Sequence, residues 1–180
     1  MSLEQLISNC KKNDTKAQSQ LYKLFSGKLF SICLKYSRSY AEAEDNLQDS
    51  FVTIFKKIDQ YNKKGSFEGW LKRITINTAL QRYRDKGVYS LINEENIKDV
   101  SVEIEDDDID IDFLLKIIQE LPDRYRLVFN LYVLDGYSHK EVAKMLNIST
   151  GTTKSNLARA RLILKEKIEN YKQRQKSQLS

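Results

Sequence analysis

Apolar residues recur every three or four positions along most of the chain, and nowhere does a polar–apolar alternation persist. The clearest stripe lies between Ala41 and Ile58, and another runs from Thr15 to Tyr36 with Gly27 as its weak point. A period of three to four residues is that of an amphipathic helix. One proline and six glycines in 180 residues leave few positions to interrupt such helices. The pattern predicts an all-α fold.

The helical pattern falls into two parts on either side of an acidic stretch. A loop is predicted at 61–66, and a third helix from Phe67 to about Lys86 follows it. Gly65 or Ser66 could cap the start of this helix. From Val88 to about Ile109 acids predominate and no helical stripe survives, as in flexible linkers. We expect a helical domain at 1–88, an acidic flexible linker at 89–109, a second helical domain at 110–172 and a polar tail at 173–180.

Charge is distributed unevenly along the sequence. Residues 91–112 contain ten acids and one base, whereas the remainder contains 29 bases and 15 acids and so carries a net charge of +14. A basic body suggests a polyanionic partner, and the acidic segment would avoid or imitate that partner. The linker is therefore open to two interpretations, a soluble spacer or a mimic of a nucleic-acid path.

Several classes of protein are disfavoured by the residue types present. Cys10 and Cys33 lack CxxC spacing, so we expect buried or inert thiols in a reducing compartment. There is no basic leader or apolar run of membrane-spanning length, which predicts a cytoplasmic protein without membrane insertion. His139, the only histidine, is expected to be solvated in the first turn of a helix. With no His/Cys cluster or phosphate loop, we expect no enzyme activity, metal or cofactor.

The segment Asp135 to Ile168 has the order of a helix-turn-helix. Ser138 and Glu141 form an S-x-x-E capping box that would start a helix at His139. Asn147 stands where the chain must turn and tolerates the left-handed conformation. Ser149 or Thr150 would then cap a second helix, which is the arrangement of DNA-binding helix pairs.

The outward face of that second helix is predicted to contact DNA. In such motifs its N-terminal half enters the major groove, where Arg or Lys can pair with guanine and Asn with adenine. The alternative is a solvated basic face within a helical packing unit. The candidate DNA-binding residues are Thr152, Lys154, Ser155, Asn156, Arg159 and Arg161.

The stripe that ends at Ile58 leaves an acidic face on the other side of its helix. Asp45, Gln48 and Asp49 lie at i, i+3 and i+4 and so form one patch about a turn long, with Asn46 expected on the same polar face. The patch fits a basic or polar groove on another protein. From spacing alone, a solvated helix face is the favoured interpretation.

Cations and aromatic residues are mixed around the third predicted helix. Cations neutralise phosphates, and aromatic rings can hold unstacked bases, so the combination suits single-stranded DNA. Trp70 is expected to belong mainly to the core. The candidate DNA-binding residues of the loop and helix are Asn62, Lys63, Lys64, Ser66, Phe67, Lys72, Arg73, Asn77, Arg82 and Arg84.

Three motifs in this order resemble those of the extracytoplasmic-function (ECF) group of bacterial RNA polymerase sigma factors. They are AEDNLQDSFVTIFKKI at 43–58, GSFEGWLKRITINTALQRYRDK at 65–86, and LPDRYRLVFNLYVLDGYSHKEVAKMLNISTGTTKSNLARAR from Leu121 onward. The likeness covers nearly the whole chain. Asn147, Thr153 and Asn156 depart from it, since the family usually has Gly, an apolar residue and often Arg at these places.

The resemblance implies a function for each surface. Asp45, Gln48 and Asp49 would dock on core RNA polymerase, at the clamp helices of its largest subunit. The loop from Asn62 to Ser66, with Phe67, would receive a flipped base of the melted non-template strand at the −10 element, and the helix-turn-helix would read the −35 element as duplex. An anti-sigma factor is a common further partner in the family.

The residues also allow a stand-alone helix-turn-helix regulator that binds duplex operators as a dimer. Such a regulator would not need an acidic docking helix and an aromatic, basic segment together. A protein that only captures other factors would leave the basic recognition helix without a use. The resemblance favours a sigma factor that directs promoter-specific transcription initiation and helps to melt DNA.

Overall fold

The computed structural model describes residues 1–85 and 109–178, and within these ranges it contains helices and no strand. The all-α prediction is therefore confirmed. The chain divides into two compact units between Arg82 and Tyr83. The predicted linker, 89–109, lies outside the described residues except for Ile109.

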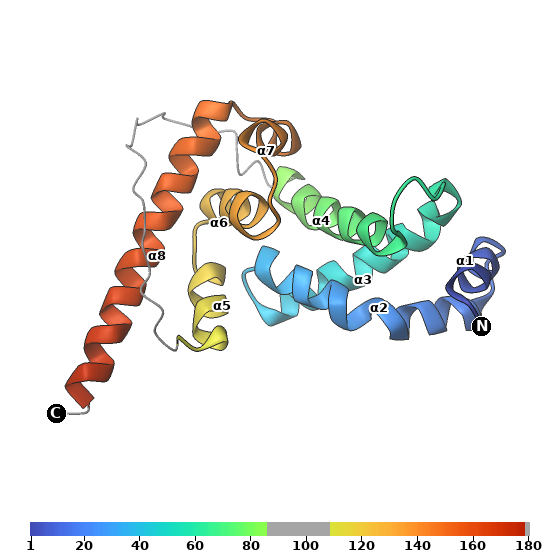
Figure 1. Cartoon of the computed structure of the whole chain (residues 1–180), viewed down its shortest axis with the longest axis horizontal. Coiled ribbons are helices and arrows are strands. Elements are labelled where there is room, and N and C mark those ends of the chain that lie inside the picture. The colour runs from blue at the N-terminus through green and yellow to red at the C-terminus, as the bar shows by residue number, and fades with distance from the viewer. Residues whose placement is uncertain (86–108, 179–180) are drawn as a thin grey trace. The chain divides into compact units, whose positions relative to one another are not determined.

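The first unit is built on two long helices that pack side by side, α2 (Thr15–Tyr36) and α3 (Tyr40–Lys57), as Figure 1 shows. They follow the short helix α1 (Leu3–Lys11) and lead into a 3-10 turn, η1 (Ile58–Gln60). The next helix, α4 (Phe67–Asp85), starts where the sequence predicts. There the Ser66 hydroxyl caps it by accepting a hydrogen bond from the Gly69 amide at 3.0 Å.

Gly27 does not interrupt α2, although glycine inside a helix costs about 1 kcal/mol relative to alanine. Around it, the apolar stripes of α2, α3 and α4 form one core. Its buried members include Leu21, Leu29, Leu47, Phe51, Ile54, Phe67 and Leu71.

A small polar cluster is buried with this core. Asn46, expected on the exposed polar face of α3, is instead fully buried and donates through Nδ2 to the Ser37 hydroxyl at 2.8 Å. Ser37 ends α2 and donates in turn to the Cys33 carbonyl at 2.7 Å. The expectation for Asn46 was wrong because its amide satisfies the end of a neighbouring helix, a requirement that α3 alone does not reveal.

The second unit contains α5 (Ile111–Gln119), α6 (Asp123–Phe129), a π-helical turn η2 (Asn130–Leu134), α7 (His139–Leu146) and α8 (Thr150–Gln178). The Asp110 carboxylate caps α5 by accepting from the Asp112 amide at 3.1 Å. Arg126 donates to the carbonyls of Gln119 and Leu121, at 3.1 and 2.8 Å, and so satisfies the end of α5. Because α8 continues to Gln178, the predicted polar tail is largely helical.

Both cysteines are buried and unpaired, as predicted. Burial raises the pKa of the Cys33 thiol to about 12 and raises the pKa of Cys10 above its ordinary value. The reactive thiolate is therefore disfavoured at both positions.

None of the helices in residues 1–85 and 109–178 is both long and apolar enough to span a bilayer. Within the same residues, no three His, Cys, Asp or Glu side chains come together as a metal site would require.

Candidate functional surfaces

The helix-turn-helix forms as the sequence predicts. The Ser138 hydroxyl accepts from the Glu141 amide at 3.3 Å, and the Ser138 amide donates to the Glu141 carboxylate at 2.8 Å, which completes the capping box of α7. This backbone hydrogen bond lowers the pKa of Glu141. Asn147 adopts the left-handed conformation with φ of 55°, and the Ser149 hydroxyl caps α8 by accepting from the Thr152 amide.

The six candidate residues on α8 do not all face outward. Lys154 is exposed, and Ser155, Arg159 and Arg161 are partly exposed. In contrast, Thr152 is 3% exposed and Asn156 is 7% exposed, so the expectation that these two lie on the outward face was wrong. The reason is that α8 packs against α5, α6 and α7, which together cover more of its circumference than a single partner would.

His139 is also placed differently from the prediction. Its ring is half-buried and stacks on Tyr132, with centroids 4.2 Å apart and planes 21° apart. Its Nδ1 lies 3.0 Å from the Thr153 hydroxyl. The same hydroxyl also lies within hydrogen-bond distance of the Thr150 carbonyl, at 2.8 Å. His139 therefore joins α7 to α8 instead of being solvated.

The acidic patch on α3 is exposed at all three predicted positions, Asp45, Gln48 and Asp49. Two of them face a cation of the same unit. Arg82 of α4 lies 3.1 Å from Asp49 Oδ2 and 3.7 Å from Asp45 Oδ2, measured from its Nη2 and Nη1 atoms. The structure thus brings together residues assigned separately to polymerase docking and to DNA binding.

The third predicted docking residue, Gln48, lines a pocket between α2 and α3 together with Glu44. Glu44 was not among the predicted residues. Its position four residues before Gln48, on the same side of the helix, is the signal that could have found it.

The loop before α4 borders a pocket of about 270 Å³. Asn62, Lys64 and Ser66 of the predicted set line it, as does Arg73 from the first half of α4. Tyr61 and Trp70 contribute aromatic rings, with centroids 5.6 Å apart. Tyr61 was missed because an isolated tyrosine at the start of a loop carries no periodic signal.

Phe67 does not belong to the accessible surface of this loop. It is 4% exposed and packs in the core, where its ring stacks on Trp70 with centroids 5.7 Å apart. The expectation that Phe67 lies on the surface that contacts DNA was wrong, because its ring is buried behind Trp70. Trp70 itself is half-buried and also lines the pocket.

The remaining candidates around α4 differ in their surroundings. Lys63 forms a 2.7 Å ion pair with Glu4, and this hydrogen bond raises the pKa of Lys63. Lys72 is partly exposed, and Arg73, Asn77 and Arg84 are exposed. Arg73 and Asn77 are four residues apart and so share one face of the helix, next to the pocket that Arg73 lines.

Comparison with known proteins agrees with this arrangement. Residues 21–88 match the model of sigma-70 region 2, and residues 114–164 match that of sigma-70 region 4. The ECF RNA polymerase sigma factor SigW of Bacillus subtilis is 28% identical over 94% of this chain and 98% of its own. The ECF RNA polymerase sigma-E factor of Escherichia coli is 27% identical over 91% and 93%, respectively.

A solved structure shares the fold. The sigma factor RpoE of Bartonella quintana, determined in complex with the anti-sigma factor NepR, superposes with a TM-score of 0.53 at 24% identity and covers 84% of this chain and 96% of its own. Two sigma-70 regions in order, with full-length relatives of one group, define the class. The chain belongs to the sigma-70 family, in its ECF group.

Proposed function

We propose that this chain binds core RNA polymerase and directs promoter-specific transcription initiation through three surfaces. The observation that carries the proposal is the order of the two family matches. Residues 21–88 include the acidic patch of α3 and the loop pocket before α4, and residues 114–164 include the helix-turn-helix.

The acidic patch is the polymerase-docking surface. Asp45, Gln48 and Asp49 are exposed on one well-packed helix, so their backbone positions are fixed before docking. Carboxylates of this kind complement a basic groove and speed encounter with it. The groove would lie on the clamp helices of the largest polymerase subunit.

The loop pocket is the downstream-element surface. Its volume of about 270 Å³, its aromatic side chains Tyr61 and Trp70 and its cations Lys64 and Arg73 suit a single unstacked base and the adjoining phosphate. Arg73 and Asn77 would continue this contact along α4. Capture of a flipped base of the non-template strand would favour the melted promoter.

The exposed part of α8 is the upstream-element surface. Lys154, Ser155, Arg159 and Arg161 remain accessible near the start of the recognition helix. A helix placed in the major groove in this way reads base edges with its first turns and contacts phosphates with its cations. Thr152 and Asn156 would support the helix instead of reading bases.

The same proposal covers the protein's regulation and location. An anti-sigma factor would act as an inhibitory partner, which is supported by the complex of the Bartonella quintana sigma factor with NepR. The chain would work with RNA polymerase in the cytoplasm. It would be a transcription regulator without catalytic residues of its own.

The test is co-elution of the purified protein with bacterial core RNA polymerase. We expect a stable complex with the wild type and none with the double variant Gln48→Ala/Asp49→Arg. The protein alone should bind duplex DNA only weakly. Tight duplex binding without any polymerase association would contradict the proposal and favour a stand-alone regulator.

A further inference from the structure

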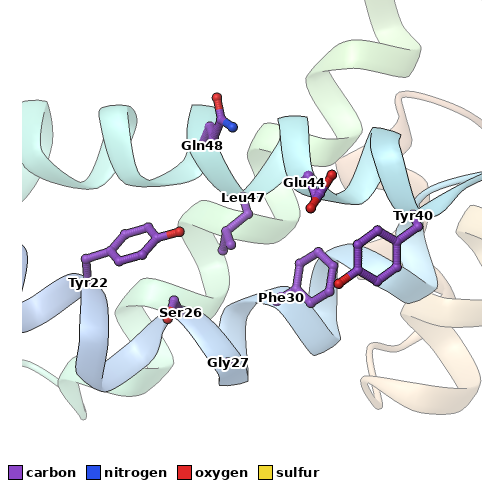
Figure 2. Close-up of a pocket in the computed structure, with 8 residues that line it drawn as sticks. All are labelled: Tyr22, Ser26, Gly27, Phe30, Tyr40, Glu44, Leu47 and Gln48. Atoms are coloured by element: carbon purple, nitrogen blue, oxygen red, sulfur yellow. The ribbon is translucent and has the colours of Figure 1, made fainter.

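A pocket of about 290 Å³ lies between α2 and α3, next to the docking patch, and Figure 2 shows its lining. Tyr22 stands at one end, and the rings of Phe30 and Tyr40 lie together at the other. Leu47 reaches down from α3 between them. Ligand sites for small molecules usually span about 300 to 1,000 Å³, so this pocket is sized for one long side chain.

Gly27 is the unusual member of this lining. It lies in the middle of α2, where glycine is the least favourable residue apart from proline. The fold does not require it, because a Cβ built at Gly27 meets no atom of residues 1–85 or 109–178 within 4 Å. The backbone also has no positive φ there. A side chain at this position would instead reduce the open volume of the pocket.

The walls of the pocket are aromatic and accessible. Tyr22 and Tyr40 are 41% and 61% exposed. Each ring packs against a second aromatic ring. The Tyr22 and Phe51 ring centroids are 4.6 Å apart, and those of Tyr40 and Phe30 are 5.0 Å apart. Rings held in place in this way can receive a partner at little entropic cost.

Charge selects the occupant. Glu44 provides a carboxylate at the α3 side of the pocket, and Gln48 lies at its edge with the amide directed away from α2. Aromatic faces next to a carboxylate suit a planar cation on an apolar stem, because the rings attract the cation and cover the stem. Arginine meets both conditions, since its guanidinium stacks on rings and pairs with carboxylates in a fixed geometry.

We propose that this pocket, which we call the Gly27 pocket, binds an arginine side chain from the polymerase surface on which α3 docks. The inference rests on the proposed function. It is continuous with the docking patch because Gln48 belongs to both. The docking surface would then extend from α3 onto α2, with Gly27 keeping the space for the arginine.

The first test fills the pocket. Gly27→Met places a long side chain in the open volume, and Ser19→Met adds the same side chain at an exposed position of the same helix. We expect Gly27→Met to weaken core polymerase binding ~10-fold, the loss of one well-placed interface contact, with Ser19→Met near the wild type. Both variants should melt at or above the wild-type temperature. Gly27→Ala, a smaller change, repeats the test if Gly27→Met proves unstable.

The second test removes the charge. Glu44→Gln keeps the shape of the side chain, and Asp59→Asn makes the same charge change on an exposed residue outside the pocket. We expect Glu44→Gln to weaken polymerase binding roughly 5-fold and to reduce its dependence on salt, because a screened ion pair is lost. Asp59→Asn should bind like the wild type.

The outcomes of these binding measurements distinguish failure of the proposed function from failure of the arginine pocket. If the wild-type protein does not bind core polymerase, the proposed function itself is refuted. If the wild type binds, Gln48→Ala/Asp49→Arg does not, and Gly27→Met and Glu44→Gln bind normally, the function stands and the arginine pocket is refuted. If Gly27→Met weakens binding while Glu44→Gln has no effect, the occupant is apolar, and the assignment of arginine is wrong.

Discussion

Helices α3 and α8 each carry polar residues that the sequence assigns to binding, yet the structure exposes the two sets differently. All three predicted docking residues on α3 are exposed. On α8, two of the six predicted DNA-binding residues, Thr152 and Asn156, are buried. The difference follows from packing, because α3 packs mainly along α2 whereas α8 packs against α5, α6 and α7.

This comparison shows when polar character predicts exposure. A helix with one principal partner has one apolar stripe, so most polar positions lie toward solvent. Both helices also bury small polar residues that can form hydrogen bonds, as Asn46 does on α3, but the helix among three partners buries more of them. Thr152 is one of these on α8, since its hydroxyl lies 2.8 Å from that of Ser149 in the preceding turn.

The largest expected effect separates the two surfaces. Asp49→Arg should weaken polymerase binding at least ~100-fold, because it places a cation against a basic groove, with upstream duplex recognition unchanged. Arg159→Ala should weaken binding to the upstream duplex about 10-fold and leave polymerase binding unchanged. Asp49→Asn is the matched control, because it removes the negative charge at position 49 without placing a positive charge next to Arg82. Equal effects of Asp49→Arg and Arg159→Ala in polymerase and duplex titrations would contradict separate surfaces.

A second experiment compares exposed and buried positions of α8. Lys154→Ala should weaken binding to the upstream duplex about 5-fold for all sequences and reduce the salt slope by about 1. Asn156→Ala should leave base preference unchanged. Because Asn156 Nδ2 has no hydrogen-bond partner among the residues that the structure describes, we expect the free energy of unfolding to change by less than about 1 kcal/mol. A new base preference for Asn156→Ala, measured by selection from a duplex library, would show that its side chain reads DNA.

A third prediction concerns the ion pair beside the docking patch. Arg82→Gln frees Asp45 and Asp49, so polymerase affinity should rise roughly 2- to 3-fold. The free energy of unfolding should fall by no more than about 1 kcal/mol, because both carboxylates are largely exposed.

Lys16→Gln, at an exposed position in the first turn of α2, makes the same charge change without releasing either carboxylate. If both variants raise affinity equally in a titration with core polymerase, net charge explains the effect and the ion pair does not.

The smallest expected effect is a pH dependence confined to the helix-turn-helix. The hydrogen bond from Ser138 lowers the pKa of Glu141 below its ordinary value of 4.5. The stabilisation by the capping box is therefore present above that value and is lost as pH falls through the lowered pKa of the folded state. Glu141→Gln keeps a capping-box residue and should remove this dependence, as followed by thermal unfolding across the acidic range. An unchanged acidic slope in Glu141→Gln would assign the dependence to other groups.

Local features could be predicted well from the sequence. Ser66 and Ser138 cap the helices they were expected to cap, and Asn147 makes the left-handed turn. Each of these involves groups within about three residues of one another, so no distant neighbour has to be known. The order of three motifs was enough to identify the family.

Tertiary structure decided which of the candidate residues meet and which are accessible. Phe67 is buried with Phe25 of α2 against its ring, and Arg82 meets Asp49 across 33 positions. The Gly27 pocket exists only because α2 and α3 lie side by side. Sequence determined the helices and their ends because hydrogen bonding there is local. Only packing determined the surfaces, because burial depends on which neighbours cover each face.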